Sequence, residues 1–259
     1  MITHGRTELL TLAAQLTVQT DDPVAGWIVE TWDANENVRS LAIACYEALL
    51  LGGSSGAAQL LESFGVDVGA LLIAPAPSAA KITRADVIEL LAAAMLIRDG
   101  FSPDELFMPN VPKMSRKKSD SGLDVTAIRL GTEPDGSGDT LWIASVKHSI
   151  SKSSSADVRW KVADSLSRTS MSSAYLAVQF RVLNAKLREQ GVAEVDAERI
   201  YYFLRDDAQM KVIGVAAVAD DLAADLAKQV GAIASASWPD AVFRKVGFAR
   251  LRRLAEDCP

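Results

Sequence analysis

Two strand-like segments joined by a turn-forming stretch constrain the fold of this chain more than any other feature. The first reads GLDVTAIRL (122–130), the second reads LWIASVKHS (141–149), and TEPDGSGD lies between them. Aliphatic and β-branched residues fill both segments, whereas Gly, Asp and Pro fill the connection, so the pattern predicts a β-hairpin. Such pairing places Asp124, at the start of one strand, and Lys147, near the end of the other, at the same end of a small sheet.

A carboxylate and an ammonium at one end of a sheet are two of the three groups that a metal-dependent phosphodiesterase needs. The third is a second carboxylate, whereas Ser145, two residues before Lys147, offers only a hydroxyl. Strand alternation places Ser145 and Lys147 on the same face. Two plainer interpretations stay open: Asp124 could cap the preceding loop, and Lys147 could protect the end of an edge strand from aggregation.

The N-terminal part of the chain has a different pattern. Apolar residues recur at three- and four-residue spacing through residues 5–75, which predicts helices. The Pro/Ala/Ser stretch APAPSAAK (74–81) is the best candidate for a domain boundary. We therefore expect a small acidic helical domain over residues 1–78, followed by an α/β domain over residues 79–259.

Helices and strands alternate after this boundary. The segment 82–101 begins with a capping-box pattern, Thr83 followed by Asp86, and ends at an Asp-Gly pair, so it predicts a helix. The other expected elements are a helix from about residue 156, a helix over 172–191, strands over 198–205 and 211–219, and helices over 220–234 and 240–257. Helices before and after a group of four strands predict an α/β sandwich.

Glu89 lies within VIELLAAAMLI, where nearly every neighbour is apolar. A carboxylate buried in such a helix costs several kcal/mol unless it meets a cation, a metal ion or hydrogen-bond donors. Alternatively, Glu89 could occupy a narrow polar edge of the helix and face solvent. The sequence leaves both interpretations open.

The charge of the chain is unevenly distributed, although its formal net value is -6. Residues 1–80 contain 2 basic and 9 acidic residues, whereas residues 81–190 contain 16 basic and 13 acidic residues. The central part could therefore offset the charge of a phosphate backbone locally. Ordinary surface charge is the competing interpretation for the candidate nucleic-acid contacts, which are Lys113, Arg116, Lys117, Lys118, Lys152 and Arg159.

Membrane and secreted classes are not expected. The sequence contains no run of 18 apolar residues, so we expect no membrane partner. The N-terminus lacks the pattern of an export signal, which favours a cytoplasmic protein. Cys45 and Cys258 lie far apart and belong to no CxxC pair, so neither a disulfide framework nor a zinc site is expected.

The order of these features resembles the PD-(D/E)XK nuclease superfamily over roughly residues 82–219. A helix with Glu89 precedes a strand with Asp124, a hairpin strand ending in xxK at Lys147, and a further helix. The resemblance implies an α-β-β-β-α-β sandwich with a mixed sheet, which binds Mg²⁺ (or Mn²⁺) and hydrolyses phosphodiester bonds in DNA. It also implies that Asp124 and Glu89 are metal ligands and that Lys147 is the catalytic lysine.

A finer resemblance is to the nuclease subunits of bacterial anti-phage defence systems, including the Hachiman type. LIRDGF, SGLDV and LWIASVKHS match the corresponding landmarks of those subunits. This resemblance implies a role in antiviral defence beside a helicase or another ATPase, and this chain has no Walker A motif of its own.

Ser145, in place of the usual acid, has three possible consequences. Glu89 could reach the metal and replace the missing ligand, since only the position of an oxygen ligand matters. A carboxylate from elsewhere, such as Asp157 or Asp164, could do so instead. In the third case the site binds magnesium poorly, and the domain is a non-catalytic module that binds nucleic acid or regulates a helicase. We expect the first.

Overall fold

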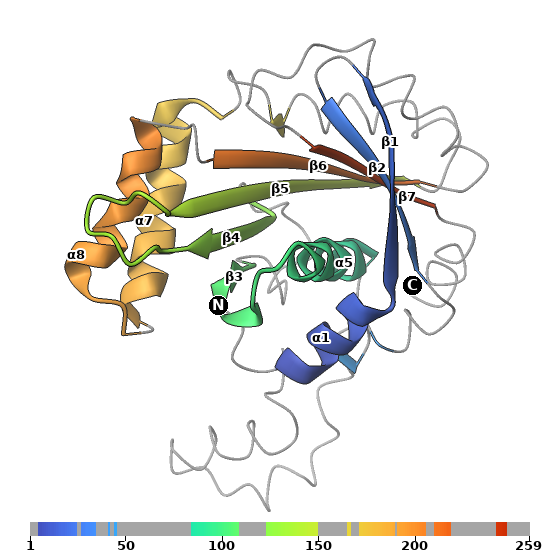
Figure 1. The fold of residues 1–259 in the computed structure, drawn as a ribbon, viewed down its shortest axis with the longest axis horizontal. Coiled ribbons are helices and arrows are strands. Elements are labelled where there is room, and N and C mark those ends of the chain that lie inside the picture. The colour runs from blue at the N-terminus through green and yellow to red at the C-terminus, as the bar shows by residue number, and fades with distance from the viewer. Residues whose placement is uncertain are drawn as a thin grey trace, which may run out of the picture.

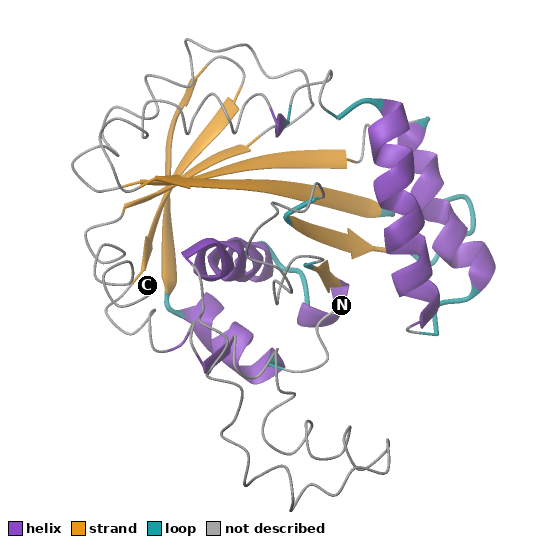
Figure 2. Cartoon of the chain, turned by 180° about the vertical axis from the view of Figure 1, so that it is seen from behind, coloured by secondary structure: helices purple, strands orange, loops and turns teal. Residues whose placement is uncertain are grey.

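One mixed sheet of seven strands organises the protein, in the order β1-β2-β7-β6-β5-β4-β3 (Figure 1). The computed structural model describes residues 5–24, 27–34, 41, 44–45, 84–108, 123–149, 165–166, 171–189, 191–205, 210–218 and 242–247. Helices accompany the sheet on both of its faces, so the predicted α/β class is confirmed (Figure 2).

The predicted hairpin is present and lies near one end of the sheet. β4 (Val125–Arg129) pairs antiparallel with β5 (Thr140–Ser149), with a register that runs from Val125 opposite Ala144 to Arg129 opposite Thr140. The short strand β3 (Leu106–Phe107) pairs antiparallel with β4 on its other side, and β6 (Met210–Val218) pairs parallel with β5. The strand predicted over 211–219 is therefore confirmed as β6.

The N-terminal part is not wholly helical, which corrects the prediction for residues 5–75. α1 (Arg6–Ala14) is a helix, but β1 (Leu16–Val24) and β2 (Trp27–Ala34) form an antiparallel hairpin. Among the strands that the structure describes, β1 is the last at its end of the sheet, and its register shifts between Asp21 and Val24. Pro23 falls at this irregularity, where its missing N–H breaks no regular ladder bond.

The C-terminal prediction also needs correction. Residues 242–247 form the strand β7 (Val242–Gly247) inside the segment expected to be an amphipathic helix. β7 lies between β2 and β6 and is parallel to both, so the N-terminal hairpin and the C-terminal strand belong to one sheet. The expected boundary between residues 78 and 79 lies outside the described residues, and the division into two domains stays a prediction.

Two long helices pack against opposite faces of the sheet, and both were predicted. α5 (Arg84–Arg98) is buried along its whole middle, because it lies between the sheet and α1. α7 (Ser173–Glu189) is amphipathic and packs against the other face. Its buried side chains are Leu176, Phe180, Leu183 and Leu187.

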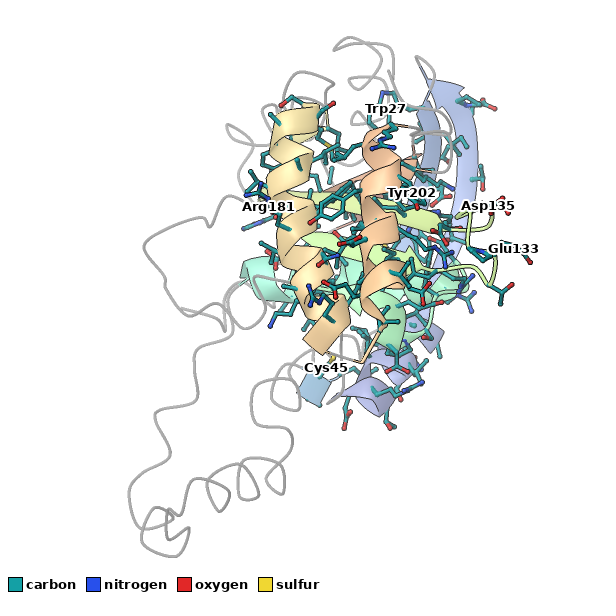
Figure 3. All side chains as sticks on the ribbon, turned by 90° about the vertical axis from the view of Figure 1, so that its left-hand side faces the viewer. Trp27, Cys45, Glu133, Asp135, Arg181 and Tyr202 are labelled. Carbon is teal, nitrogen blue, oxygen red and sulfur yellow. The ribbon has the colours of Figure 1, made fainter. Side chains whose placement is uncertain are left out.

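The segment predicted as a strand over 198–205 is instead helical. α8 (Glu194–Ala197) leads directly into the 3-10 helix η2 (Glu198–Leu204), which lies beside α7 (Figure 3). Arg199, Ile200 and Phe203 are buried, a spacing that one face of a helix provides and an alternating strand does not.

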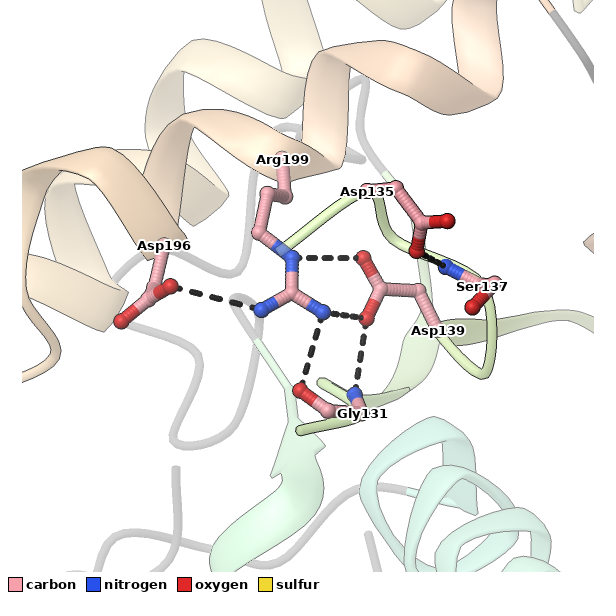
Figure 4. A network of polar contacts seen from close by, with 6 residues as sticks. All are labelled: Gly131, Asp135, Ser137, Asp139, Asp196 and Arg199. Atoms are coloured by element: carbon pink, nitrogen blue, oxygen red, sulfur yellow. Dashed lines mark hydrogen bonds and ion pairs between the residues drawn. The ribbon is translucent and has the colours of Figure 1, made fainter. Parts of the chain in front are cut away.

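A buried ion pair fastens η2 to the turn between β4 and β5 (Figure 4). The Arg199 guanidinium donates to both carboxylate oxygens of Asp139, to the backbone carbonyl of Gly131 at 2.9 Å and to Asp196 at 3.3 Å. Asp139 also accepts the backbone N–H of Gly131 at 2.7 Å. This network joins the two ends of the β4–β5 turn to each other and to η2.

Several expectations fall on residues that the structure does not describe. These are the helix over 220–234, nearly all of the helix from about 156, and the six candidate nucleic-acid contacts Lys113, Arg116, Lys117, Lys118, Lys152 and Arg159. Within the described part of the chain, no helix has the length and apolar character that crossing a membrane requires.

Candidate functional site

The hairpin brings Asp124 and Lys147 together at one end of β4. The Lys147 ammonium lies 3.5 Å from Oδ2 of Asp124, and the two side chains remain 32% and 18% exposed respectively. Both groups therefore face each other at a place that a solute can reach. This is the juxtaposition that the pairing of the two segments predicts.

Asp124 is held by the backbone of the neighbouring strand. β5 continues past the point where β4 begins, so the Val146 N–H lies beyond the last regular pair of the ladder. Oδ2 of Asp124 accepts this N–H at 2.7 Å. The carboxylate therefore replaces a backbone acceptor beside β5, and this bond fixes its orientation.

Ser145 lies where the resemblance implies a second acid, and it offers only a hydroxyl. The side chain is buried, and its Oγ lies 2.6 Å from Oγ of Ser165 and 3.5 Å from Oδ2 of Asp124. The Lys147 ammonium donates to Ser145 Oγ at 3.3 Å and to the Val146 carbonyl at 3.2 Å. Ser145 thus links the Asp124–Lys147 pair to a second hydroxyl.

A pocket of about 70 Å³ opens around these groups. Its apolar wall comes from the sheet and from the residues before α7, and its polar wall comes from one carboxylate, one ammonium and three hydroxyls. The lining residues are Leu123, Asp124, Ile143, Ala144, Ser145, Lys147, Ser165, Leu166, Met171 and Tyr175. The pocket is polar enough and large enough for an ion with some of its water.

Tyr175 and Ser165 are the two polar members that sequence reasoning missed. Tyr175 lies in the first turn of α7 and is half-buried against the core. Burial raises the pKa of Tyr175, and the negative charge of Asp124 raises it further, because both disfavour the phenolate. No local sequence signal marks these residues, since their place depends on how α7 packs on the hairpin.

Glu89 lies in a different environment from the pocket. It is buried in α5, and α5 shares its core with Val125, Ala127, Ala144 and Val146. Asp124, Ser145 and Lys147 alternate with those residues, so their side chains point to the opposite face of the sheet. Glu89 is not among the residues that line the pocket.

His148 lies next to Lys147 in β5 and points to the opposite face by the same alternation. It is absent from the lining of the pocket. His148 therefore lies apart from the Asp124–Lys147 pair, although it is next to Lys147 in the sequence.

The described residues supply part of a divalent-metal site. Asp124 contributes the one carboxylate of the pocket, and Ser145, Ser165 and Tyr175 contribute neutral oxygens. Among the residues placed by the structure, no group of three or more His, Cys, Asp or Glu side chains gathers to hold a metal ion. One carboxylate beside an ammonium does not by itself fit Mg²⁺, which prefers more negative charge among its oxygen ligands.

Comparison with known proteins adds no family assignment. No protein-family model matches the sequence, and a search of curated proteins finds no match.

Proposed function

We propose that this protein is a metal-dependent nuclease that hydrolyses phosphodiester bonds in DNA. One observation carries the proposal: the Lys147 ammonium and the Asp124 carboxylate lie 3.5 Å apart in a small pocket at the rim of a hairpin. A fixed cation beside a fixed carboxylate suits a reaction in which negative charge develops on a phosphate.

The order of elements supports a PD-(D/E)XK-like topology. Apart from the short helices η1, α8 and η2, the described elements from α5 to β6 are α5, β3, β4, β5, α7 and β6, which is the α-β-β-β-α-β order that the resemblance implies. β3, β4 and β5 are antiparallel neighbours and β6 joins β5 in parallel, so the sheet is mixed as expected. Membership of the PD-(D/E)XK superfamily is part of this proposal.

Each side chain of the pair has a role in the proposed reaction. Lys147 binds a non-bridging phosphate oxygen or steadies the attacking hydroxide through its ammonium. Asp124, oriented by the Val146 N–H, would be the carboxylate ligand of a divalent ion. A bound Mg²⁺ or Mn²⁺ would supply Lewis-acid activation of the phosphate and of a water molecule.

We propose a second acidic ligand other than Glu89, the residue that the sequence led us to expect. Glu89 is the weaker candidate, because α5 packs on the opposite face of the sheet. Asp157 and Asp164 precede Ser165 in the chain, and Ser165 is part of the pocket. We propose that one of these two aspartates completes the ligand set.

The biological setting is proposed from the resemblance. A DNA substrate agrees with the excess of basic residues in the central part of the chain, where the 113–118 cluster would contact the backbone. Antiviral defence beside a helicase or ATPase rests on the similarity of LIRDGF, SGLDV and LWIASVKHS to the defence nucleases.

Nicking of a supercoiled plasmid with Mg²⁺ or Mn²⁺ tests the proposal. Wild type is expected to nick, and Asp124→Asn and Lys147→Met are each expected to lose about 100-fold or more in rate, the usual effect of removing one such group. Glu133→Gln and Arg181→Met are matched controls, because both side chains are exposed and lie outside the pocket. Equal rates for wild type, Asp124→Asn and Lys147→Met would eliminate the proposal.

A second function has one observation in its favour, namely the hydroxyl of Ser145 where an acid is usual. In this alternative the domain is a non-catalytic module of the same fold that binds nucleic acid or regulates a helicase. The Ser145→Asp variant decides between the two. If the wild-type protein cleaves no substrate and Ser145→Asp gains cleavage, the native site is degenerate and the alternative is supported. Active wild-type protein refutes the alternative.

A further inference from the structure

The Lys147 ammonium is already fully engaged in the structure. It has three N–H donors, and three acceptors lie within reach: Asp124 Oδ2 at 3.5 Å, Ser145 Oγ at 3.3 Å and the Val146 carbonyl at 3.2 Å. A phosphate oxygen that approaches Lys147 must displace one of these bonds. A second donor in the pocket would offset that loss.

Tyr175 is the candidate for this second donor. It lines the same pocket as Asp124, Ser145 and Lys147. Its ring packs against the core beneath α7, and its backbone N–H donates to Oγ of Ser172 at 3.4 Å at the start of that helix. Within the described part of the chain, no hydrogen bond engages the Tyr175 hydroxyl. Tyr175 therefore lines the pocket together with Asp124 and Lys147 and can offer its hydroxyl there as a donor.

A tyrosine hydroxyl is already protonated at physiological pH. Burial and the charge of Asp124 raise the pKa of Tyr175 further, in the same direction. A neutral phenol donates to a phosphate oxygen, whereas a phenolate would repel it. Asp124 would also repel a phosphate, and the adjacent Lys147 ammonium offsets that repulsion.

We propose that Tyr175 contacts the substrate: its hydroxyl, together with the Lys147 ammonium, binds a non-bridging oxygen of a nucleic-acid phosphodiester. The inference rests on the proposed function, since it assigns a further residue to the same site. It goes beyond that function because it specifies a metal-independent contact between the phenol and the phosphate backbone.

The test compares Tyr175→Phe with wild type in two assays. The first is plasmid nicking with Mg²⁺ or Mn²⁺, analysed as kcat and KM, and the second is fluorescence anisotropy with a labelled DNA oligonucleotide in EDTA. Tyr175→Phe removes only the hydroxyl, which holds no hydrogen bond to another described residue, so its melting temperature should equal that of wild type. Tyr202→Phe is the matched control, because its ring lies at the β4–β5 turn in a separate pocket.

Loss of a hydrogen bond to a charged group should weaken binding by about tenfold, both in KM and in the anisotropy Kd. Tyr202→Phe should match wild type in both assays. If wild type nicks DNA and Tyr175→Phe has the same kcat, KM and Kd, the inference is overturned while the nuclease proposal stands.

If wild type binds but never nicks, the nuclease proposal fails, and weaker binding by Tyr175→Phe still supports the phosphate contact. If wild type neither nicks nor binds DNA, both proposals fall. A lower melting temperature for Tyr175→Phe with unchanged binding would show a merely structural role and would also overturn the inference.

Discussion

The buried pair of Arg199 and Asp139 yields the most quantitative prediction. The two side chains are 5% and 3% exposed, so removal of one partner leaves the other charged group away from water. Breaking a buried ion pair in this way typically costs about 3–5 kcal/mol. In Asp139→Ala, Arg199 keeps its bonds to the Gly131 carbonyl and to Asp196, so we expect a loss near the lower limit, about 3 kcal/mol.

A double-mutant cycle separates the interaction from the cost of each change. Urea unfolding followed by circular dichroism gives the free energy of unfolding for wild type, Asp139→Ala, Arg199→Met and the double variant. For a chain of this size, a loss of about 3 kcal/mol lowers the melting temperature by roughly 6–12 °C. Because the double variant buries no unpaired charge, its loss should fall short of the sum by on the order of 2 kcal/mol.

Additive losses, equal to the sum within about 0.5 kcal/mol, would refute the reasoning. The result would mean that the two groups do not interact across the turn and that η2 is fastened to the hairpin by apolar packing alone. Asp135→Asn is a suitable control, because this exposed side chain lies in the same turn and is outside the ion pair.

Three further predictions concern single positions. Burial alone would raise the pKa of Glu105, but hydrogen bonds, foremost from Arg129, lower it overall. The Glu105 carboxylate therefore stabilises the fold above pH 4.5, and this contribution is lost as the pH falls through the lowered pKa. Glu105→Gln should therefore flatten the acid limb of a plot of melting temperature against pH. Gly136→Ala should cost about 1–2 kcal/mol in urea unfolding, because φ is +80° and a Cβ would lie 3.0 Å from the ring of Tyr202; no change would contradict the turn geometry. Burial raises the pKa of Cys45 to about 12, so in a Cys258→Ser background a thiol reagent at pH 8 should label the protein only after unfolding, and rapid labelling of the native protein would contradict its burial.

Local sequence patterns were sufficient for the central hairpin and for the two long helices. The hairpin of β4 and β5 follows from two short runs and the turn between them, and α5 and α7 follow from caps and apolar spacing. Because Asp124 and Lys147 belong to one hairpin, their juxtaposition needs no long-range information, and the sequence predicted it.

Two of the elements that were predicted wrongly, β7 and η2, depend on distant partners, whereas β1 and β2 were missed although they pair with each other. β7 resembles a basic helix in sequence, but Arg244 is buried in it because the side chain donates to Glu30 at 2.8 Å and to Asp99 at 2.5 Å. Those partners lie 214 and 145 residues away, and no local pattern reports them. Likewise, Arg199 of η2 pairs with Asp139, which is 60 residues away.

The residues that gather at the site could not be predicted from local sequence patterns either, because they depend on how distant elements pack. Glu89 follows the expected order of elements, yet the side of the sheet on which α5 packs decides what it can reach. Tyr175 enters the pocket only because α7 lies on the same face as Asp124, and its local sequence carries no mark of that role.

The central claim is that a divalent ion binds at Asp124 beside Lys147. The most direct test is the anomalous scattering of Mn²⁺ in crystals of the wild-type protein, with Asp124→Asn crystals soaked in the same way as the comparison. The account predicts a peak on the Asp124 carboxylate, with a second carboxylate from residues 150–164 on the same ion, and no peak in the variant. Wild-type crystals that bind Mn²⁺ elsewhere and leave Asp124 without a peak would contradict it.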